Sequence, residues 1–497
     1  MKQSIQQLIN QLKSKNSVTC SGLSGSSQAM LIKQIYQDCK QCLVIVVPTD
    51  RQAETLLDDI TFFRGNTNIP LYHFPANPAL PSDFMSYQNK NAAQRIRILY
   101  DLISGHTPPV IITTAEALSQ YIVPKKALAD YAELIIQGED INRDELIKRL
   151  IAGGYSHELI VEEPGDFCVR GGILDVFSTL YDDPIRMEWF GETIDSMRFF
   201  SHKSQRTIKN ITEATIVPAR ESIIYPEKET ILLHNIRQYA TQLGIPSSKI
   251  RSWIDQIKEE KNFSVLDGLI SFVYEDMNLL FDYIDSNTLF ILSSPSSLER
   301  EATDAFYHAE QNFIAAKDEK RLCVPPDNIY CAWSAIYEKI VTKHFLQINH
   351  IQTESYNIDN NDSLPVQFSI EDNLDLKSQL KEQRDKEHLL QPLVDWINVQ
   401  KTNGSLTLLI CRSKNQARRL ESLLKPYSVD LHLTEIIPDL NKSYGKTYIC
   451  LGQISSGFIW EMARIAIASE DEIFGPKRRR KKTDNQKFKQ TSFLFKI

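Results

Sequence analysis

The chain opens with an alternation of two hydrophobic patterns. Residues 43–47 and 110–113 are short, nearly continuous apolar runs, which are typical of strands buried on both faces. Residues 5–12, 52–63 and 92–103 space their apolar positions three or four apart, which predicts helices. Strands that alternate with helices favour a mostly parallel sheet covered by helices. We therefore expect the first 120 residues to form an α/β domain.

The pattern changes to short alternating strands in residues 121–218, where Pro-Gly, Gly-Gly and Asp-Asp-Pro turn signals recur. Within this stretch, the run 185–190 alternates strictly, so its apolar positions share one face of a strand. The opposite face carries Arg186, Glu188 and Phe190. The alternation predicts an antiparallel meander domain with one buried face.

The rest of the chain predicts the domain organisation. Residues 219–349 are rich in helical patterns with isolated strands, and we expect them to complete the first domain, with the meander domain inserted. Residues 350–475 return to strand–helix alternation and predict a separate small α/β domain. Residues 476–497 contain the run KRRRKK at 477–482, which favours a solvated basic linker, with nucleic-acid contact as the alternative. The expected fold class is multidomain α/β.

Composition narrows the class of protein further. The 497 residues carry 56 Lys+Arg against 63 Asp+Glu, a formal net charge of −7, which argues against a general polyanion binder. No apolar run approaches the ~18–20 residues that span a bilayer, and the first residues lack the continuous apolar core of a signal peptide. Eight cysteines are scattered, and only Cys39 and Cys42 lie close together, without a second pair. We expect a cytoplasmic protein in a reducing compartment, with no membrane contact and no metal site.

The first strand–helix junction resembles a phosphate loop that has lost its working residues. The functional motif is G-x-x-x-x-G-K-[ST], whose lysine and hydroxyl group bind phosphate and Mg²⁺. Aligned on Gly22, with Gly25 inside the loop, the second glycine becomes Ser27, the lysine becomes Gln28 and the hydroxyl position becomes Ala29. Residual phosphate binding by the helix N-terminus stays open, but we expect no nucleotide cofactor and no ATP hydrolysis here.

No other catalytic arrangement can be recognised in the sequence. The acidic residues 470–472 follow the apolar run 465–468 in the manner of a metal-binding strand end, but they lie hundreds of residues after the loop. We interpret them as a solvated strand end. No G-x-S-x-G or H-E-x-x-H occurs, and no catalytic residue is predicted.

The meander domain carries the most informative candidate site. Arg170 precedes a Gly-Gly turn, and Arg186 and Phe190 lie about 13 Å apart on the solvent-directed face of one strand. Arginine and aromatic residues are favoured interface anchors. In the alternative interpretation, Arg186 pairs with Glu188 or Asp183, and Phe190 lies beneath a loop.

A resemblance adds to this interpretation. Residues 163–177, EPGDFCVRGGILDVF, resemble the E-PGE[FY]xxRGGIxDxF signature of bacterial transcription-repair coupling factors and of their relative UvrB. The likeness continues through 184–200, 204–207 and 216–221, and the ending 469–475 before KRRRKK is similar to the family's link toward an RNA-polymerase-interacting domain. It covers essentially the whole chain, less closely between 220 and 400.

Two departures separate this chain from UvrB itself. UvrB keeps a working phosphate loop, whereas Gln28 and Ala29 stand here. UvrB also has a tyrosine-rich hairpin that probes DNA, and the corresponding stretch 71–91 is short, with Tyr72, Phe74, Phe84 and Tyr87. The resemblance therefore implies the catalytically degenerate, helicase-like UvrB module of a coupling factor. The family's ATP- and Mg-dependent translocase motor, which acts on double-stranded DNA, belongs to a longer protein, so we expect an N-terminal fragment with weak or no DNA binding.

The resemblance also implies a partner. In the family, this module recruits UvrA to RNA polymerase stalled at DNA lesions, and its contact residues match Arg170, Arg186 and Phe190, with Glu188 and Arg206 as further members. In the full-length family a C-terminal domain masks this surface. Two alternatives remain: a nucleotide-dependent repair enzyme of the UvrB type, and a DNA-binding module that uses residues 477–482.

Overall fold

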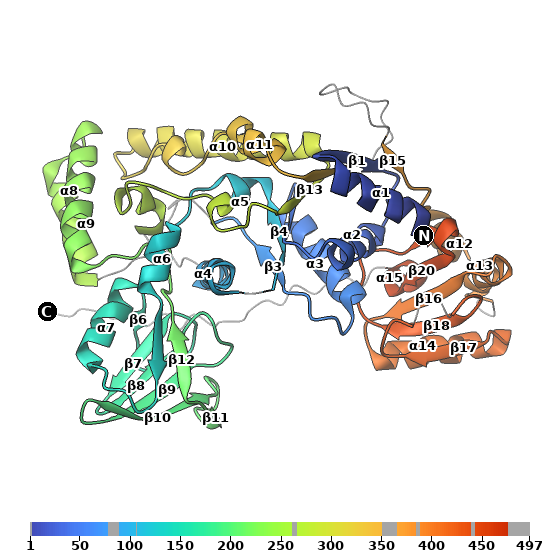
Figure 1. Cartoon of the computed structure of the whole chain (residues 1–497), viewed down its shortest axis with the longest axis horizontal. Coiled ribbons are helices and arrows are strands. Elements are labelled where there is room, and N and C mark those ends of the chain that lie inside the picture. Colours follow the sequence, from blue (N-terminus) through green and yellow to red (C-terminus); the bar gives the residue numbers. More distant parts are fainter. Residues whose placement is uncertain are drawn as a thin grey trace, which may run out of the picture. The chain divides into compact units, whose positions relative to one another are not determined.

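The computed structural model describes residues 2–77, 89–105, 107–260, 266–349, 365–383, 388–438 and 443–475. The chain divides into two compact units, residues 1–369 and 370–497, which are described separately (Figure 1). The basic run at 477–482, and with it the alternative of a DNA-binding tail, lies outside the described residues, as do Phe84 and Tyr87 of the expected hairpin stretch.

A parallel sheet of seven strands forms the centre of the first unit. Its order is β15-β1-β14-β13-β2-β4-β3, and every neighbouring pair is parallel. The apolar run at 43–47 becomes β2, which is buried along its whole length, as expected. The strands are β1 (Ser17–Ser21), β2 (Leu43–Val47), β3 (Leu71–Phe74), β4 (Val110–Thr114), β13 (Leu289–Ser293), β14 (Phe345–Asn349) and β15 (Val366–Gln367).

Helices cover this sheet, and α2 packs beside α3 while α10 packs beside α5 (Figure 1). The helical spacing near the N-terminus is confirmed, because Leu8 and Ile9 of α1 are fully buried. In the described ranges no helix is long and apolar enough to cross a membrane. The helices of this unit are α1 (Lys2–Ser14), α2 (Ser27–Cys39), α3 (Asp50–Arg64), α4 (Asn89–Ser104), α5 (Ala115–Ser119), α6 (Lys125–Tyr131), α7 (Arg143–Ala152), α8 (Pro226–Gln242), α9 (Ser247–Glu260), α10 (Pro295–Asp318) and α11 (Trp333–Val341).

The chain between α6 and α8 forms an inserted domain. Its six-stranded sheet has the order β11-β10-β9-β8-β7-β6 and is antiparallel apart from the β6–β7 pair. The expected alternation is confirmed, since Ile185 and Met187 are fully buried in a core that includes Leu146 and Leu150 of α7. The strands are β6 (Ser156–His157), β7 (Asp166–Arg170), β8 (Ile173–Val176), β9 (Ile185–Phe190), β10 (Thr193–Phe200) and β11 (Thr207–Asn210), with a second pair of β5 (Glu133–Ile136) and β12 (Glu213–Ile216).

The second unit contains a smaller sheet of order β17-β18-β16-β20-β19, parallel except for the β19–β20 pair. The fold class expected from the sequence is therefore confirmed: a parallel α/β domain with an antiparallel insertion, plus a smaller α/β unit. The elements of this unit are α12 (Leu374–Glu382), α13 (Gln391–Thr402), β16 (Leu406–Cys411), α14 (Lys414–Leu424), β17 (Leu431–Thr434), β18 (Thr447–Leu451), β19 (Phe458–Trp460), β20 (Ile465–Ser469) and α15 (Glu470–Phe474).

The acidic residues after β20 are not the solvated strand end that we expected. Glu472 is buried, and its Oε2 accepts hydrogen bonds from the backbone N–H groups of Ser469 (2.7 Å) and Gly457 (2.9 Å). Glu470 is also buried and accepts from the backbone N–H of Arg412 (3.0 Å). The expectation was wrong because these carboxylates satisfy backbone donors at the start of α15 and at nearby turns.

A buried ion pair anchors the chain where it returns from the inserted domain. Nε of Arg95, on α4, lies 2.5 Å from Oε1 of Glu221, and their side chains are only 1% and 3% exposed. Glu221 also accepts from the backbone N–H of Val123 (3.1 Å). The Arg95 guanidinium donates to the Pro75 carbonyl (2.8 Å) and lies 4.4 Å from the Phe74 ring centroid. The pair therefore joins four separate segments of the first unit.

The short strand β15 closes the edge of the parallel sheet against the first loop. The backbone N–H of Phe368 donates to the Ser21 carbonyl (2.9 Å), and a Cβ atom on Gly22 would lie 1.8 Å from the Phe368 carbonyl oxygen. Gly22 is thus required by chain packing. Because β15 belongs to this sheet, the first unit runs to residue 369, beyond the boundary at 349 that we expected.

We predict that Arg95→Met destabilises the chain by about 3–5 kcal/mol, because Glu221 would remain buried without its cation. Thermal unfolding followed by circular dichroism measures the change. Arg97→Met on the same helix is the matched control: its pair with Asp182 is 44% and 89% exposed, so the loss should stay below about 1 kcal/mol. Equal effects of the two variants would contradict the account.

We also predict that Gly22→Ala lowers the melting midpoint more than Gly65→Ala. Both glycines have positive φ angles, +81° and +54°, which strain an alanine by about 1–3 kcal/mol. Only Gly22 adds a backbone clash, since nothing lies within 4 Å of a Cβ at Gly65. Similar midpoints for the two variants would show that the contact with Phe368 is not a constraint.

Candidate functional site

The outer face of the inserted sheet, opposite the core under α7, gathers the residues that we singled out from the sequence. The strand register places Cys168, Asp175 and Arg186 in one row and Arg170, Ile173 and Glu188 in the next. Arg198 and Ser196 of β10 continue these two rows. Charged side chains thus occupy neighbouring positions on four strands.

Arg186 is anchored within this face. Its Nε and Nη2 donate to the two carboxylate oxygens of Asp175, both at 2.7 Å, and the guanidinium lies 4.4 Å from the Phe200 ring centroid. Asp175 is 2% exposed and Arg186 is 17% exposed. The hydrogen bond to Asp175 raises the pKa of Arg186. The ion-pair partner of Arg186 is therefore Asp175, and neither Glu188 nor Asp183, the two partners considered from the sequence. Asp175 has this role because it lies directly opposite Arg186 on the neighbouring strand, β8.

Glu188 is engaged by its neighbours on β10. Its Oε1 lies 2.5 Å from Nη2 of Arg198, and its Oε2 accepts a hydrogen bond from Ser196 (2.9 Å). These contacts, with that of Arg198 first, lower the pKa of Glu188. Arg198 was missed in the sequence analysis, although the alternation that continues through 193–200 was a signal for it.

Phe190 stands at the end of β9 and is 84% exposed, so no described loop covers it. It pairs across a two-residue turn with Thr193, and the turn requires the positive φ of Gly191 (+69°). The inward-facing neighbour, Trp189, donates its Nε1–H to the Ile141 carbonyl (3.0 Å). The strand end is therefore fixed while the Phe190 ring remains in solvent.

Arg170 lies at the same end of the sheet as Phe190. It is exposed, precedes the β7–β8 turn, and its Nη2 donates to the Leu159 carbonyl (2.6 Å). The carbonyl of Gly171 in that turn accepts a hydrogen bond from Arg143 of α7. The structure thus brings Arg170 and Phe190 together at the hairpin end of the outer face, the end formed by the β7–β8 and β9–β10 turns.

Arg206, which the resemblance suggested as a further member, lies at the opposite end. Its carbonyl accepts from the backbone N–H of Ser201, just after β10 ends at Phe200. The eight residues of β10 separate this point from Phe190 by roughly 20 Å. A single contact region at the hairpin end therefore does not include Arg206.

The polar groups of the degenerate loop before α2 form hydrogen bonds within the loop and to β13. The backbone N–H of Ser24 donates to Oγ of Ser27 (3.0 Å), and Gln28 donates from Nε2 to Oγ of Ser293 (3.4 Å). Ser27 and Ala29 are fully buried, and Gly25 has a positive φ (+54°). Donors that a phosphate loop directs at its ligand are used here within the protein.

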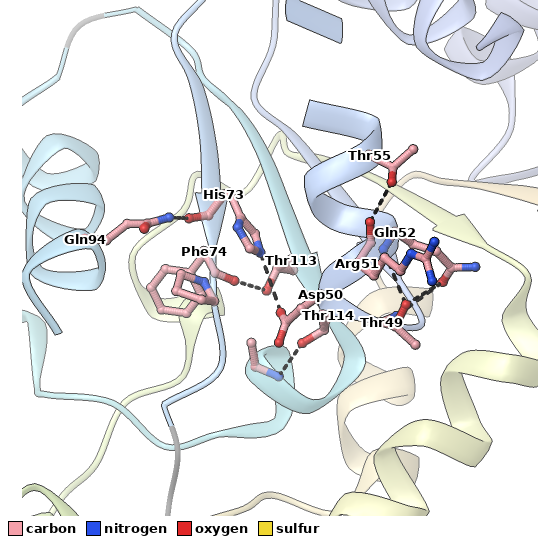
Figure 2. Close-up of polar contacts among 12 residues, drawn as sticks. Thr49, Asp50, Arg51, Gln52, Thr55, His73, Phe74, Gln94, Thr113 and Thr114 are labelled. Carbon is pink, nitrogen blue, oxygen red and sulfur yellow. Dashed lines mark hydrogen bonds and ion pairs between the residues drawn. The ribbon is translucent and has the colours of Figure 1, made fainter. Parts of the chain in front are cut away.

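The carboxyl ends of β2, β3 and β4 hold a second polar group, which the sequence analysis missed (Figure 2). Oδ1 of Asp50 lies 3.6 Å from Nε2 of His73, and Thr113 donates to the Phe74 carbonyl (3.0 Å). Thr49 caps α3. The contacts of Thr49 and Thr113 satisfy polar backbone groups at the start of α3 and at the end of β3. No group of three metal-binding side chains occurs in the part of the chain that the structure describes.

Comparisons with known proteins find similar sequences for the inserted domain and for the whole chain. Residues 134–221 match the UvrB interaction domain. The chain is 27% identical to the transcription-repair-coupling factor of Myxococcus xanthus, over 97% of this chain and 41% of that protein. The Bacillus subtilis (strain 168) protein of the same name is 26% identical, over 95% of this chain and 40% of that protein. A third protein of this name, from Staphylococcus aureus (strain MRSA252), is 25% identical, over 62% of this chain and 27% of that protein.

A solved XPD helicase is 8% identical and covers 91% of this chain and 80% of that one, with a TM-score of 0.23, too low to support an argument. The chain spans about two fifths of the length of the M. xanthus and B. subtilis relatives. Two findings thus converge: the chain is similar over nearly all of its length to proteins named transcription-repair-coupling factor, and its inserted domain matches the UvrB interaction domain.

Proposed function

We propose that the chain is an adaptor whose inserted domain docks the repair protein UvrA. In the longer relatives, this docking would bring UvrA to RNA polymerase stalled at a DNA lesion. The similarity to transcription-repair-coupling factors over nearly all of the chain, and the match of residues 134–221 to the UvrB interaction domain, support this role. The protein as a whole would be the DNA translocase, with its ATP and Mg site outside this chain.

One observation carries the proposal: an exposed aromatic ring beside an exposed arginine on a fixed strand end. Phe190 is 84% exposed, and Arg170 lies two strands away at the same end of the sheet. A few residues carry most of the binding energy at protein interfaces, and aromatic and arginine side chains are enriched at such sites. A matching UvrA surface offers an apolar pocket for Phe190 and a carboxylate for Arg170.

Arg186 contributes to the docking surface from a more buried position. Asp175 accepts one hydrogen bond from Nε and one from Nη2, so both N–H groups of Nη1 and the second N–H of Nη2 are not used by Asp175. The pair with Asp175 fixes the guanidinium before binding, and this lowers the entropy lost in the complex.

The module itself is proposed to be catalytically inactive. Gln28 and Ala29 replace the lysine and hydroxyl of a working phosphate loop, and the loop's polar groups bond within the protein. This favours the adaptor over a nucleotide-dependent enzyme of the UvrB type.

We predict that the chain binds purified UvrA with micromolar or better affinity in a calorimetric titration without nucleotide. Phe190→Ala and Arg170→Ala should each weaken binding by well over tenfold, since interface anchors contribute about 2 kcal/mol or more. Ile208→Ala is the matched control: Ile208 is 54% exposed but lies on β11, far from Phe190, so affinity should stay within about twofold. No binding by the folded chain would contradict the proposal.

A double variant separates the two roles of Arg186. We predict that Arg186→Met lowers both the melting midpoint and UvrA affinity, because it leaves the buried Asp175 carboxylate without its counter-ion. Adding Asp175→Leu should restore the midpoint, since the buried charge is removed, but should leave UvrA binding more than about tenfold weaker than for the wild type. Recovery of affinity along with stability would show that Arg186 acts only through the fold.

A further inference from the structure

We propose that Leu159 is a second apolar contact of the docking surface and that Arg170 holds it in position. This inference rests on the proposed function and extends it to a residue outside the signature motif. Leu159 lies in the loop between β6 and β7 and is 89% exposed, slightly more than Phe190. Such large exposed apolar side chains mark partner sites when they gather beside anchor residues.

The backbone of Leu159 is held firmly although its side chain lies in solvent. Its carbonyl accepts hydrogen bonds from Nη2 of Arg170 (2.6 Å) and from Sγ of Cys168 (3.3 Å), a buried thiol. The preceding N–H, of Glu158, donates to the Phe167 carbonyl (2.9 Å). Because the backbone at Leu159 is already ordered, binding has to order only the side chain, and this lowers the entropy lost in the complex.

Leu159 and Phe190 lie on either side of Arg170 at the hairpin end. The sheet order β9-β8-β7-β6 puts Phe190 on one side and Leu159, just after β6, on the other. Three strand spacings of about 4.8 Å separate the two positions by roughly 15 Å. An interface of about 800 Å² on each partner spans this distance, so one UvrA surface can contact both side chains.

The occupant is UvrA because the Leu159 position is continuous with the proposed contact residues. The Arg170 guanidinium bonds directly to the Leu159 backbone, so a protein that reaches Arg170 also reaches Leu159. Ile160, 48% exposed, extends the apolar area beside it. The matching surface on UvrA has an acidic group between two apolar pockets.

The Leu159→Ala variant separates an effect on partner binding from an effect on the stability of the fold. Since its side chain is already in water, Leu159→Ala should leave the melting midpoint of the chain unchanged. A loss of affinity then reports contact with the partner. Arg170→Ala, by contrast, removes both a cation and the hydrogen bond to the Leu159 carbonyl, so it should weaken binding more than Leu159→Ala.

The test is a calorimetric titration of the whole chain with UvrA, with thermal melts of every variant. We expect Leu159→Ala to weaken binding at least about fivefold with an unchanged melting midpoint, and Leu159→Met to stay within about twofold of the wild type. Ile208→Ala controls for the loss of an exposed apolar side chain elsewhere on the sheet.

The outcomes distinguish this inference from the proposed function. If Phe190→Ala loses affinity while Leu159→Ala binds like the wild type, UvrA docking stands and the role of Leu159 is overturned. Lost affinity with a lowered melting midpoint in Leu159→Ala assigns a structural role and also overturns the inference. A folded wild-type chain that does not bind UvrA overturns both.

Discussion

The outer face of the inserted sheet is organised by one buried carboxylate. Asp175 is 2% exposed, and a charge buried to this degree needs a close counter-ion with well-made hydrogen bonds. Arg186 meets that need with two 2.7 Å bonds, and its guanidinium packs on Phe200. The face is thus not an open sheet, because a small second core occupies it, formed by Val161, Cys168, Phe177 and Phe200.

This arrangement concentrates the accessible side chains at the hairpin end. There the backbone is fixed by the tight turns after Arg170 and Phe190 and by the Trp189 indole hydrogen bond. The exposed side chains therefore sit on a rigid frame, which is the condition under which a few residues give tight binding. The Arg95–Glu221 pair has a comparable role for the first unit, because it ties the end of the insertion to the parallel sheet.

The sequence predicted what depends on local pattern. The buried run of β2 and the alternation of β9 were identified because neighbouring residues alone decide them. β3 and β14 were missed: β3 is short and carries His73, and β14 ends in Gln347, Ile348 and Asn349, so neither shows a clean apolar run. The burial of Glu470 and Glu472 was missed since it depends on capping contacts with distant backbone groups.

The candidate site likewise contains some residues that the sequence predicts and some features that it does not. Phe190 and Arg170 follow from the strand pattern and the signature motif, whereas the partner of Arg186 depends on strand register, which one sequence does not specify. Leu159 lies in a loop without periodicity, and its hydrogen bonds from Arg170 and Cys168, which the sequence does not reveal, place it at the proposed docking surface.

Hydrogen exchange of the chain with and without UvrA tests the central claim most directly, since it maps the docking surface without altering a residue. The account predicts that UvrA slows amide exchange at residues 158–160, 170–173 and 189–193, while the parallel sheet of the first unit is unaffected. Protection confined to other parts of the chain, such as β11 or the carboxyl ends of β2 and β4, would contradict it.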